Sequence, residues 1–223
     1  MSEYFIHIHN KSPMLLGSGK GFTNMVDSDL VFDDYGFPVF PAKRLKGLLR
    51  ESAFHLIQQC TSAGWKSFFP SIEEIFGDDT KEGSFHIYDG ILADRDSLID
   101  HLDYLKKKYP HFFSSQTILE TFTTLRHQTA LEDGVALKHS LRTSRVLKKG
   151  HRFAAPIVFE KKRDDKAIPL LALAAKNLRY VGLNRNRGFG QVQCFLEEKG
   201  QKSVDLSQEA IKRIQGGMEH ASY

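Results

Sequence analysis

Two short stretches of alternating apolar and polar residues, at 4–9 and 191–196, constrain the fold of this chain more than any other feature. In the first stretch, Tyr4, Ile6 and Ile8 fall on one face of an extended backbone. This period is typical of a strand that buries only one of its faces. The sequence therefore predicts a half-buried strand near each end of the chain.

Two helical patterns and two further strand patterns lie between these stretches. Pro41 can open a helix at its first turn, and an apolar stripe follows it. A second helix is predicted at 168–178. Strands are predicted at 85–92 and 153–160, and Pro156 indicates an edge strand or a bulge. The order strand, helix, strand, strand, helix, strand predicts an α+β fold with a ferredoxin-like βαββαβ core.

The other segments are interpreted as insertions in a single domain that spans 1–223. The core is expected at about 1–60, 83–93 and 150–200. A charged helical insertion is expected at about 94–120, an extended hairpin at about 121–149 and a short amphipathic helix at 207–216. No internal repeat and no linker rich in Gly, Pro or Ser divides the sequence.

The composition is that of an ordinary globular protein, with 41% hydrophobic and 26% charged residues. The net charge is only +4, so a nucleic-acid site must come from the clustering of cations and not from their total. Cys60 and Cys194 are too few and too far apart for a disulfide framework or a zinc knuckle. A reduced, cytoplasmic protein without a membrane segment is expected.

A basic, glycine-rich segment, Asn-Arg-Asn-Arg-Gly-Phe-Gly at 184–190, precedes the last predicted strand. Arg185 and Arg187 beside exposed backbone amides suit phosphate oxygens. Gly188 and Gly190 permit positive φ and the close approach of another molecule. A nucleic acid is the first candidate ligand, and the alternative is a tight, solvated turn.

The same segment nearly matches the basic-Gly-aromatic-Gly-aromatic-Val motif of RNA-recognition domains. However, Gln191 and Gln193 stand where that motif has later aromatic residues for base stacking. The segment also precedes the last predicted strand and not the third. A stacking platform of that kind is therefore not predicted.

Two other segments are candidate anion sites. A second glycine-rich loop contains Gly17, Ser18, Gly19 and Lys20. It lacks the spacing of a Walker motif, so contact with a nucleic-acid backbone is predicted in place of nucleotide hydrolysis. In the first helix, Lys43, Lys46 and Arg50 share one face close to the helix N-terminus, which favours an anion. The alternative is a solvated basic face.

The hairpin region is more basic than the rest of the chain. Its cations are Arg126, Lys138, Arg142, Arg145, Lys148, Lys149 and Arg152. Only Glu132 and Asp133 oppose them. Arg142 and Arg145 of this region are predicted to bind RNA, for which a solvated, charged hairpin is the alternative.

Five segments, taken together, resemble the signatures of the RAMP superfamily, the RNA-binding proteins of CRISPR systems. They occur in the order of that family at 36–41, 45–50, 75–77, 85–89 and 181–190. The resemblance extends over most of the chain. It implies a backbone-type subunit of a type III effector complex that polymerises along a CRISPR guide RNA.

The resemblance also implies partners and roles. The partners are the guide RNA, a complementary target RNA, other RAMP subunits and a large signalling subunit. Guide phosphates would be held by Lys43, Arg44, Lys46, Arg50, Arg185 and Arg187. The hairpin would be a thumb that wedges between bases through the apolar residues at its tip, Leu131, Val135, Ala136 and Leu137.

Backbone subunits of this kind carry an Asp in a loop upstream of the first helix, and Asp27 matches it better than Asp29, Asp33 or Asp34. The resemblance implies that Asp27 holds Mg²⁺ beside a phosphodiester and helps to orient the 2′-hydroxyl for attack. Alternatively, Asp27 caps a turn and the protein is a non-catalytic scaffold or capping subunit. A metal-independent endonuclease that processes guide RNA through a His is the third hypothesis, although no His lies in a recognisable catalytic arrangement.

Overall fold

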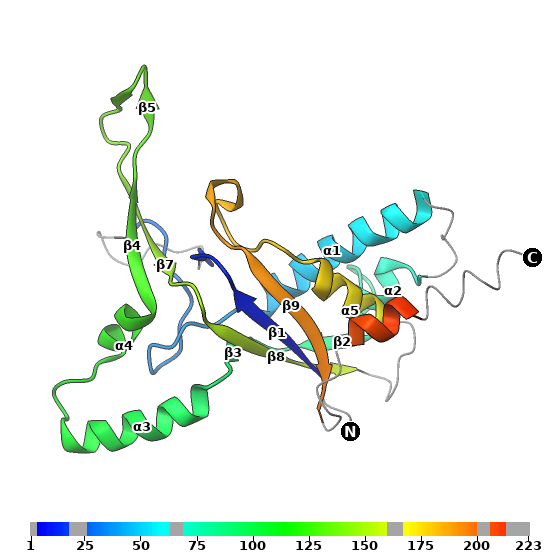
Figure 1. The fold of residues 1–223 in the computed structure, drawn as a ribbon, viewed down its shortest axis with the longest axis horizontal. Coiled ribbons are helices and arrows are strands. Elements are labelled where there is room, and N and C mark those ends of the chain that lie inside the picture. Colours follow the sequence, from blue (N-terminus) through cyan, green and yellow to red (C-terminus); the bar gives the residue numbers. More distant parts are fainter. Residues whose placement is uncertain (1–3, 18–25, 63–68, 160–166, 200–205, 213–223) are drawn as a thin grey trace, which may run out of the picture.

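The structure is a computed structural model that describes residues 4–17, 26–62, 69–159, 167–199 and 206–212. One antiparallel sheet forms the centre of the molecule (Figure 1). Its strands are β1 (Tyr4–Asn10), β2 (Phe85–Ile87), β3 (Ile91–Leu92), β8 (Arg152–Phe159) and β9 (Val192–Glu198). β1 lies between β8 and β9, and β8 pairs on its other side with both β2 and β3.

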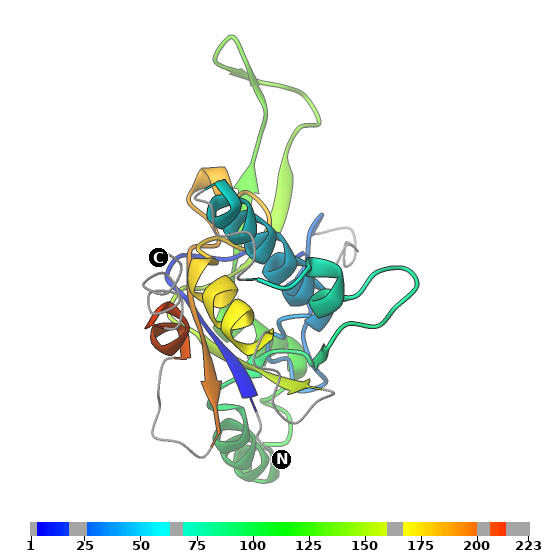
Figure 2. The same ribbon diagram turned by 90° about the vertical axis from the view of Figure 1, so that its right-hand side faces the viewer.

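Helices α1 (Ala42–Ser62) and α5 (Ala167–Asn177) lie side by side over one face of this sheet (Figure 2). When β2 and β3 are counted as one interrupted strand, the sheet order is that of a ferredoxin-like fold, so the predicted α+β fold class is confirmed. Tyr4, Ile6 and Ile8 of β1 are buried beneath the helices as expected. Their burial against the apolar stripe of α1 forms the hydrophobic core.

The strand predicted at 85–92 is interrupted, and the edge-strand interpretation of Pro156 is wrong. Strand β8 is an interior strand. The Tyr88 N–H donates to the Pro156 carbonyl at 3.0 Å, at the point where β2 ends. Because N–H and C=O of one residue point to the same side of a strand, the missing N–H of Pro156 faces the gap between β2 and β3.

The predicted hairpin protrudes from the body of the molecule (Figure 1). β4 (Thr123–Gln128) pairs with β7 (Arg142–Leu147) at its base. β5 (Leu131–Glu132) pairs with β6 (Val135–Ala136) near its tip. Asp133 and Gly134 turn the chain there with positive φ values of 50° and 81°. We call residues 123–147 the thumb hairpin.

The buried side chain of Asn10 joins the thumb hairpin to the sheet. Its Nδ2 donates to the Lys148 carbonyl at 2.8 Å, and its Oδ1 accepts from the His151 N–H at 2.7 Å. Its backbone N–H donates to the His151 carbonyl, and its carbonyl accepts the Gly150 N–H of the same turn. Since these groups satisfy one another in a buried position, the turn between β7 and β8 is held firmly against the end of β1.

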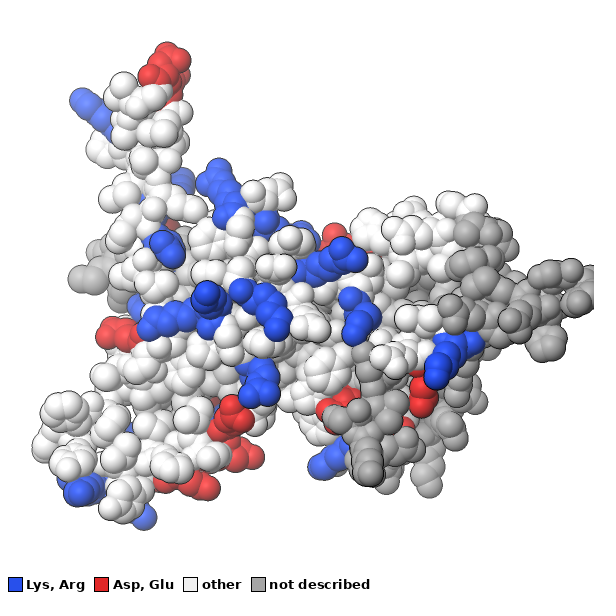
Figure 3. Space-filling model, in the orientation of Figure 1, with Lys and Arg blue, Asp and Glu red and all other residues white. Residues whose placement is uncertain are grey.

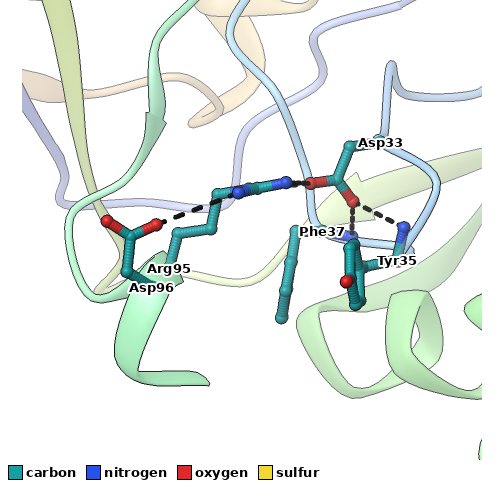
Figure 4. Close-up of polar contacts among 5 residues, drawn as sticks. All are labelled: Asp33, Tyr35, Phe37, Arg95 and Asp96. Atoms are coloured by element: carbon teal, nitrogen blue, oxygen red, sulfur yellow. Dashed lines mark hydrogen bonds and ion pairs between the residues drawn. The ribbon is translucent and has the colours of Figure 1, made fainter. Parts of the chain in front are cut away.

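The remaining helices are α2 (Ile72–Phe76), α3 (Arg95–Lys108) and α4 (Ser115–Phe122). Arg95 ties α3 to the loop before α1, because its guanidinium contacts Asp33 Oδ2 at 2.9 Å (Figure 4). Asp33 Oδ1 in turn accepts the N–H groups of Tyr35 and Phe37. A helix is predicted at 207–216. The structure has a helix at 206–212, and residues 213–216 lie outside the described residues.

No helix among the described residues is both long enough and apolar enough to cross a membrane.

Candidate functional site

The glycine-rich segment forms a closed loop between two paired stems. Val181 N–H donates to the Gly190 carbonyl, and Val192 N–H donates to the Arg179 carbonyl, both at 2.8 Å. Between the stems, the short 3-10 helix η2 (Arg185–Arg187) presents both arginines to solvent. We call residues 181–190 the glycine loop. Its fixed ends hold the two guanidinium groups on a preformed surface.

The glycines of this loop serve mainly the chain itself, which corrects one expectation. A Cβ on Gly190 would lie 1.9 Å from the Val181 carbonyl oxygen, and one on Gly182 would lie 2.4 Å from that of Leu15. The close approach predicted at Gly190 is therefore made by the protein's own backbone. Gly188, with φ +80°, has no described residue within 4 Å of its Cβ position and remains open to a ligand.

The segment after β1 joins the glycine loop to the thumb hairpin. Gly190 N–H donates to the Pro13 carbonyl at 2.7 Å, and Met14 exchanges two hydrogen bonds with Leu147 of β7. Gly17, predicted to bind RNA, is buried and forms a bridge with Leu30. The other three predicted residues of that loop, Ser18, Gly19 and Lys20, lie outside the described residues. Three segments far apart in sequence thus form one surface.

Of the two thumb arginines predicted to bind RNA, only Arg142 is exposed. Arg145 is buried, and its Nε lies 3.0 Å from Asp29 Oδ1, a carboxylate that is also buried. Its guanidinium also contacts Thr123 Oγ1 at 3.5 Å. Because this ion pair fixes the loop before α1 to the thumb base, Arg145 is a structural residue, and its prediction as an RNA contact is wrong.

Two cations that the sequence did not single out, Lys11 and Arg179, complete a basic surface. Exposed Lys and Arg side chains gather between the thumb base and the glycine loop, on the face shown in Figure 3. Those of the surrounding segments are Lys11, Arg142, Lys149, Arg152, Arg179, Arg185 and Arg187. We call these seven residues the basic patch. Their proximity follows from the pairing of β1 with β8 and β9, which spacing along the chain does not reveal.

Burial and nearby cations both lower the pKa of two histidines in this region. Burial lowers the pKa of His9, and the cations Lys11 and Arg152 lower it further. Burial likewise lowers the pKa of His151, with a second contribution from Lys148. The positive charge of a protonated imidazole is disfavoured at both positions. The nearby cations favour an anion such as a phosphate.

The N-terminus of α1 does not offer the anion site predicted from the sequence. Asp89, in the gap between β2 and β3, accepts the Ala42 N–H on Oδ1 at 2.6 Å. A carboxylate of the protein therefore already occupies the positive end of this helix dipole. The prediction of a phosphate at these helix amides is corrected accordingly.

The cationic face of α1 exists as predicted, but acidic residues face it. Lys43, Lys46 and Arg50 line one pocket of about 620 Å³ together with the loop at 77–83. That loop brings Asp78, Asp79, Lys81 and Glu82 to the same pocket. Hydrogen bonds from Thr80, and then Arg50, lower the pKa of Asp78, so this carboxyl remains ionised.

Arg44 and Gly47 differ in their surroundings. Gly47 lines the pocket with open space around its Cβ position, so no contact with the described residues explains a glycine there. Arg44 is absent from the pocket lining and shares a helix side with Glu51. Glu51 lies 3.9 Å from Arg185. Arg44 therefore belongs to the side of α1 that faces the glycine loop.

Asp27 lies exposed at the thumb base. Its N–H donates to the Thr143 carbonyl at 2.9 Å, and its Oδ2 accepts the Thr143 N–H at 2.7 Å. Asp29 is committed to Arg145 and Asp33 to Arg95. Within the described ranges, no group of three or more His, Cys, Asp or Glu side chains is arranged to hold a metal. One carboxylate fits Mg²⁺ only where RNA phosphates and water supply the other ligands.

The open face of the sheet carries aromatic rings that contact one another. His7 and Phe195 stack with ring centroids 4.8 Å apart, and Glu197 lies 2.6 Å from His7 Nε2. One face of each ring is therefore covered by the other ring. The contacts with Phe195 and Glu197 hold the His7 ring in place on the sheet.

Comparisons with known proteins agree with this architecture. Residues 7–193 match the family model described as the RAMP superfamily. A chain from the "Cryo-EM structure of the Type III-B Cmr-beta bound to cognate target RNA" is similar, with TM-score 0.58 and 16% identity. This chain covers 60% of that one, which in turn covers 88% of this chain.

A second similar structure is titled "Type III-B Cmr-beta Cryo-EM structure of the Apo state", with TM-score 0.61 and 14% identity. There the match covers 89% of this chain and 98% of the other. No curated protein is similar enough to count as a relative. Since the family model spans most of the sequence, in agreement with the five signature segments, the chain belongs to the RAMP superfamily.

Proposed function

We propose that this protein is a guide-RNA-binding subunit of a type III CRISPR effector complex. The observation that carries the proposal is the basic patch, in which seven exposed cations from four segments surround the base of a protruding hairpin. A sugar-phosphate backbone is the ligand that such a surface suits. Family membership and the fold shared with Cmr-beta chains support the same assignment.

In this proposal, affinity comes from phosphate contacts and sequence choice comes from base pairing in the RNA. Arg185 and Arg187 hold the backbone beside Gly188, the one loop glycine that is open. Arg142, Lys149 and Arg152 continue the track along the thumb base. The apolar residues at the thumb tip are exposed, which supports a role as a wedge between bases.

The test is the affinity of the purified protein for single-stranded RNA as a function of salt concentration. Each phosphate contact contributes about 0.7 to the slope of log K against log salt for a single strand. A slope of about 3 or more means that at least four contacts form. Binding that does not change with salt would contradict the proposal.

A catalytic role of Asp27 is the second part of the proposal. The observation that favours it is that two hydrogen bonds to Thr143 fix this exposed carboxylate beside the thumb base. When bound, Mg²⁺ would stabilise the negative charge that develops on a phosphodiester. Asp27 would orient the metal against the RNA backbone held by the basic patch.

The matched variants for Asp27 are D27N and D27A. Asn keeps an acceptor for the Thr143 N–H but removes the charge, whereas Ala removes both. If Asp27 is catalytic, both variants lose magnesium-dependent cleavage of guide-paired RNA and both retain guide binding. Absence of cleavage by the wild type would instead support the scaffold or capping subunit. Cleavage of repeat RNA in EDTA would support the processing nuclease.

A further inference from the structure

A second pocket, beside the glycine loop, has a lining that phosphate binding alone does not explain. Its volume is about 790 Å³, within the range of small-ligand sites. It is lined by Tyr180, Gly182, Leu183, Asn184, Arg185, Asn186 and Arg187. The lining thus combines an aromatic ring, an aliphatic side chain, two amides and two cations.

The apolar part of the lining is unusually exposed. Tyr180 is 45% exposed and Leu183 is 51% exposed. A phosphate would gain nothing from contact with either side chain. A planar base would cover both, because every base has a π-face that stacks on an aromatic ring.

The amides supply the polar part of a base site. Asn184 occupies the N-cap position of η2, yet its side chain makes no capping hydrogen bond there. Its amide is therefore not committed to the helix end. Like Asn186, it carries a donor and an acceptor on one planar group, the combination that reads the edge of a base.

The pocket is fixed before any ligand arrives. Leu183 N–H donates to the Leu15 carbonyl at 3.0 Å, and Arg187 N–H donates to the Asn184 carbonyl at 2.8 Å. Tyr180 lies in a bridge with Gln191 at the stem of the loop. A prepared site of this kind lowers the entropic cost of binding.

We propose that this pocket binds one unpaired RNA base, stacked on Tyr180, with Asn184 and Asn186 at its edge. Arg185 and Arg187 contact the phosphates on either side of that nucleotide. The base is unpaired because a Watson–Crick partner would occupy the edge that the amides read. This inference rests on the proposed RNA-binding function and adds to it a base contact within the phosphate grip.

The experiment compares two probes, an oligouridylate and the corresponding oligomer of abasic ribose phosphates. The wild type binds the oligouridylate about tenfold more tightly, the expected value of one stacked base. Y180L abolishes this preference but keeps the affinity for the abasic oligomer. Y180F, which retains the ring, behaves as the wild type. R185A/R187A weakens both probes by the same factor.

Equal affinity of the wild type for the two probes would overturn the base pocket and leave the RNA-binding function intact. Failure of the wild type to bind either probe would overturn both. If Y180L disturbs the fold, its affinity for the abasic oligomer falls as well. In that case N186A tests the base pocket. It leaves Tyr180 in place and is expected to reduce the preference for the oligouridylate over the abasic oligomer.

Discussion

The glycine loop and the cationic face of α1 have the same kind of sequence, yet the fold gives them different surroundings. Both contain closely spaced cations next to a glycine. Around the α1 pocket, Lys43, Lys46, Arg50 and Lys81 face three carboxylates. Among the described residues, the lining of the glycine-loop pocket contains two arginines and no carboxylate, and Glu51 lies 3.9 Å from one of them, Arg185.

The difference arises from what each surface has as its neighbour. The loop at 77–83 and Asp89 bring acids to α1 from segments that are distant in sequence. The glycine loop adjoins the segment that carries Lys11, and the acid near it is the single residue Glu51, 3.9 Å from Arg185. Local cation density is thus a poor guide to surface potential, because the fold determines which charges are added to it.

The largest expected effect concerns Arg145. It is the buried cation of the thumb hairpin, whereas Arg142 on the same strand is exposed and available to RNA. R145A leaves the buried carboxylate of Asp29 without its partner and lowers the free energy of unfolding by about 3 kcal/mol or more. R142A, on the same strand, changes it by less than about 0.5 kcal/mol. Chemical denaturation measures both. D29N/R145M removes both charges and recovers most of the loss, which a simple packing defect would not allow.

The next effect compares the two basic surfaces directly. R185A/R187A weakens binding of single-stranded RNA by about tenfold and reduces the salt slope by about 1.4. K43A/K46A/R50A removes three cations but has the smaller effect, because carboxylates already offset them. Fluorescence anisotropy over a range of salt concentrations measures both variants. A larger loss in the α1 variant would reverse the comparison.

Neutralising the acids of the α1 pocket should then raise its affinity for RNA. D78N/E82Q strengthens binding by about threefold, since the cations of the pocket lose two of their competing partners. Asn at position 78 keeps an acceptor for the Thr80 N–H, so the turn is preserved. E73Q/E74Q on α2 is the control for a change in net charge. An equal gain in the control would show that only the total charge matters.

The smallest effect is on pH dependence and distinguishes the basic patch from α1. In the free protein the pKa of His9 is lowered, so its imidazole is neutral at neutral pH. Phosphates nearby favour the imidazolium, so RNA binding takes up a proton and tightens by about twofold as the pH falls toward this lowered pKa. H9Q flattens the profile of affinity against pH. An unchanged profile would place the RNA away from the patch.

The same shift has the opposite consequence for folding. Because the folded-state pKa of His9 lies below its ordinary value, protonation favours the unfolded chain. Stability is therefore lost as the pH falls below about 6.5. The binding profile is to be measured above the pH at which unfolding begins.

Most of the core fold could be predicted from the sequence, because period and order are local signals. The alternation of Tyr4, Ile6 and Ile8 and the helix after Pro41 both appear as predicted. Pro156 was misinterpreted because its missing N–H faces a gap in the neighbouring strand, and no local pattern shows where a neighbour is interrupted.

The candidate site could be predicted less well, because charge pairing is not local. Arg145 and Arg142 look alike in sequence, but only the fold brings Asp29 to one of them. Lys11 was not singled out, because it meets Arg152 through the pairing of β1 with β8. Asp89 occupies the α1 N-terminus from a position 47 residues away.

The hydrogen bonds of Asn10 have a mechanical consequence for the thumb hairpin. Strand β7 continues into the interior strand β8 through a turn that four hydrogen bonds fasten to β1. Bending the hairpin at its root requires these bonds to break together. The root of the hairpin is thus rigid, and a force applied at its tip is transmitted to the centre of the sheet.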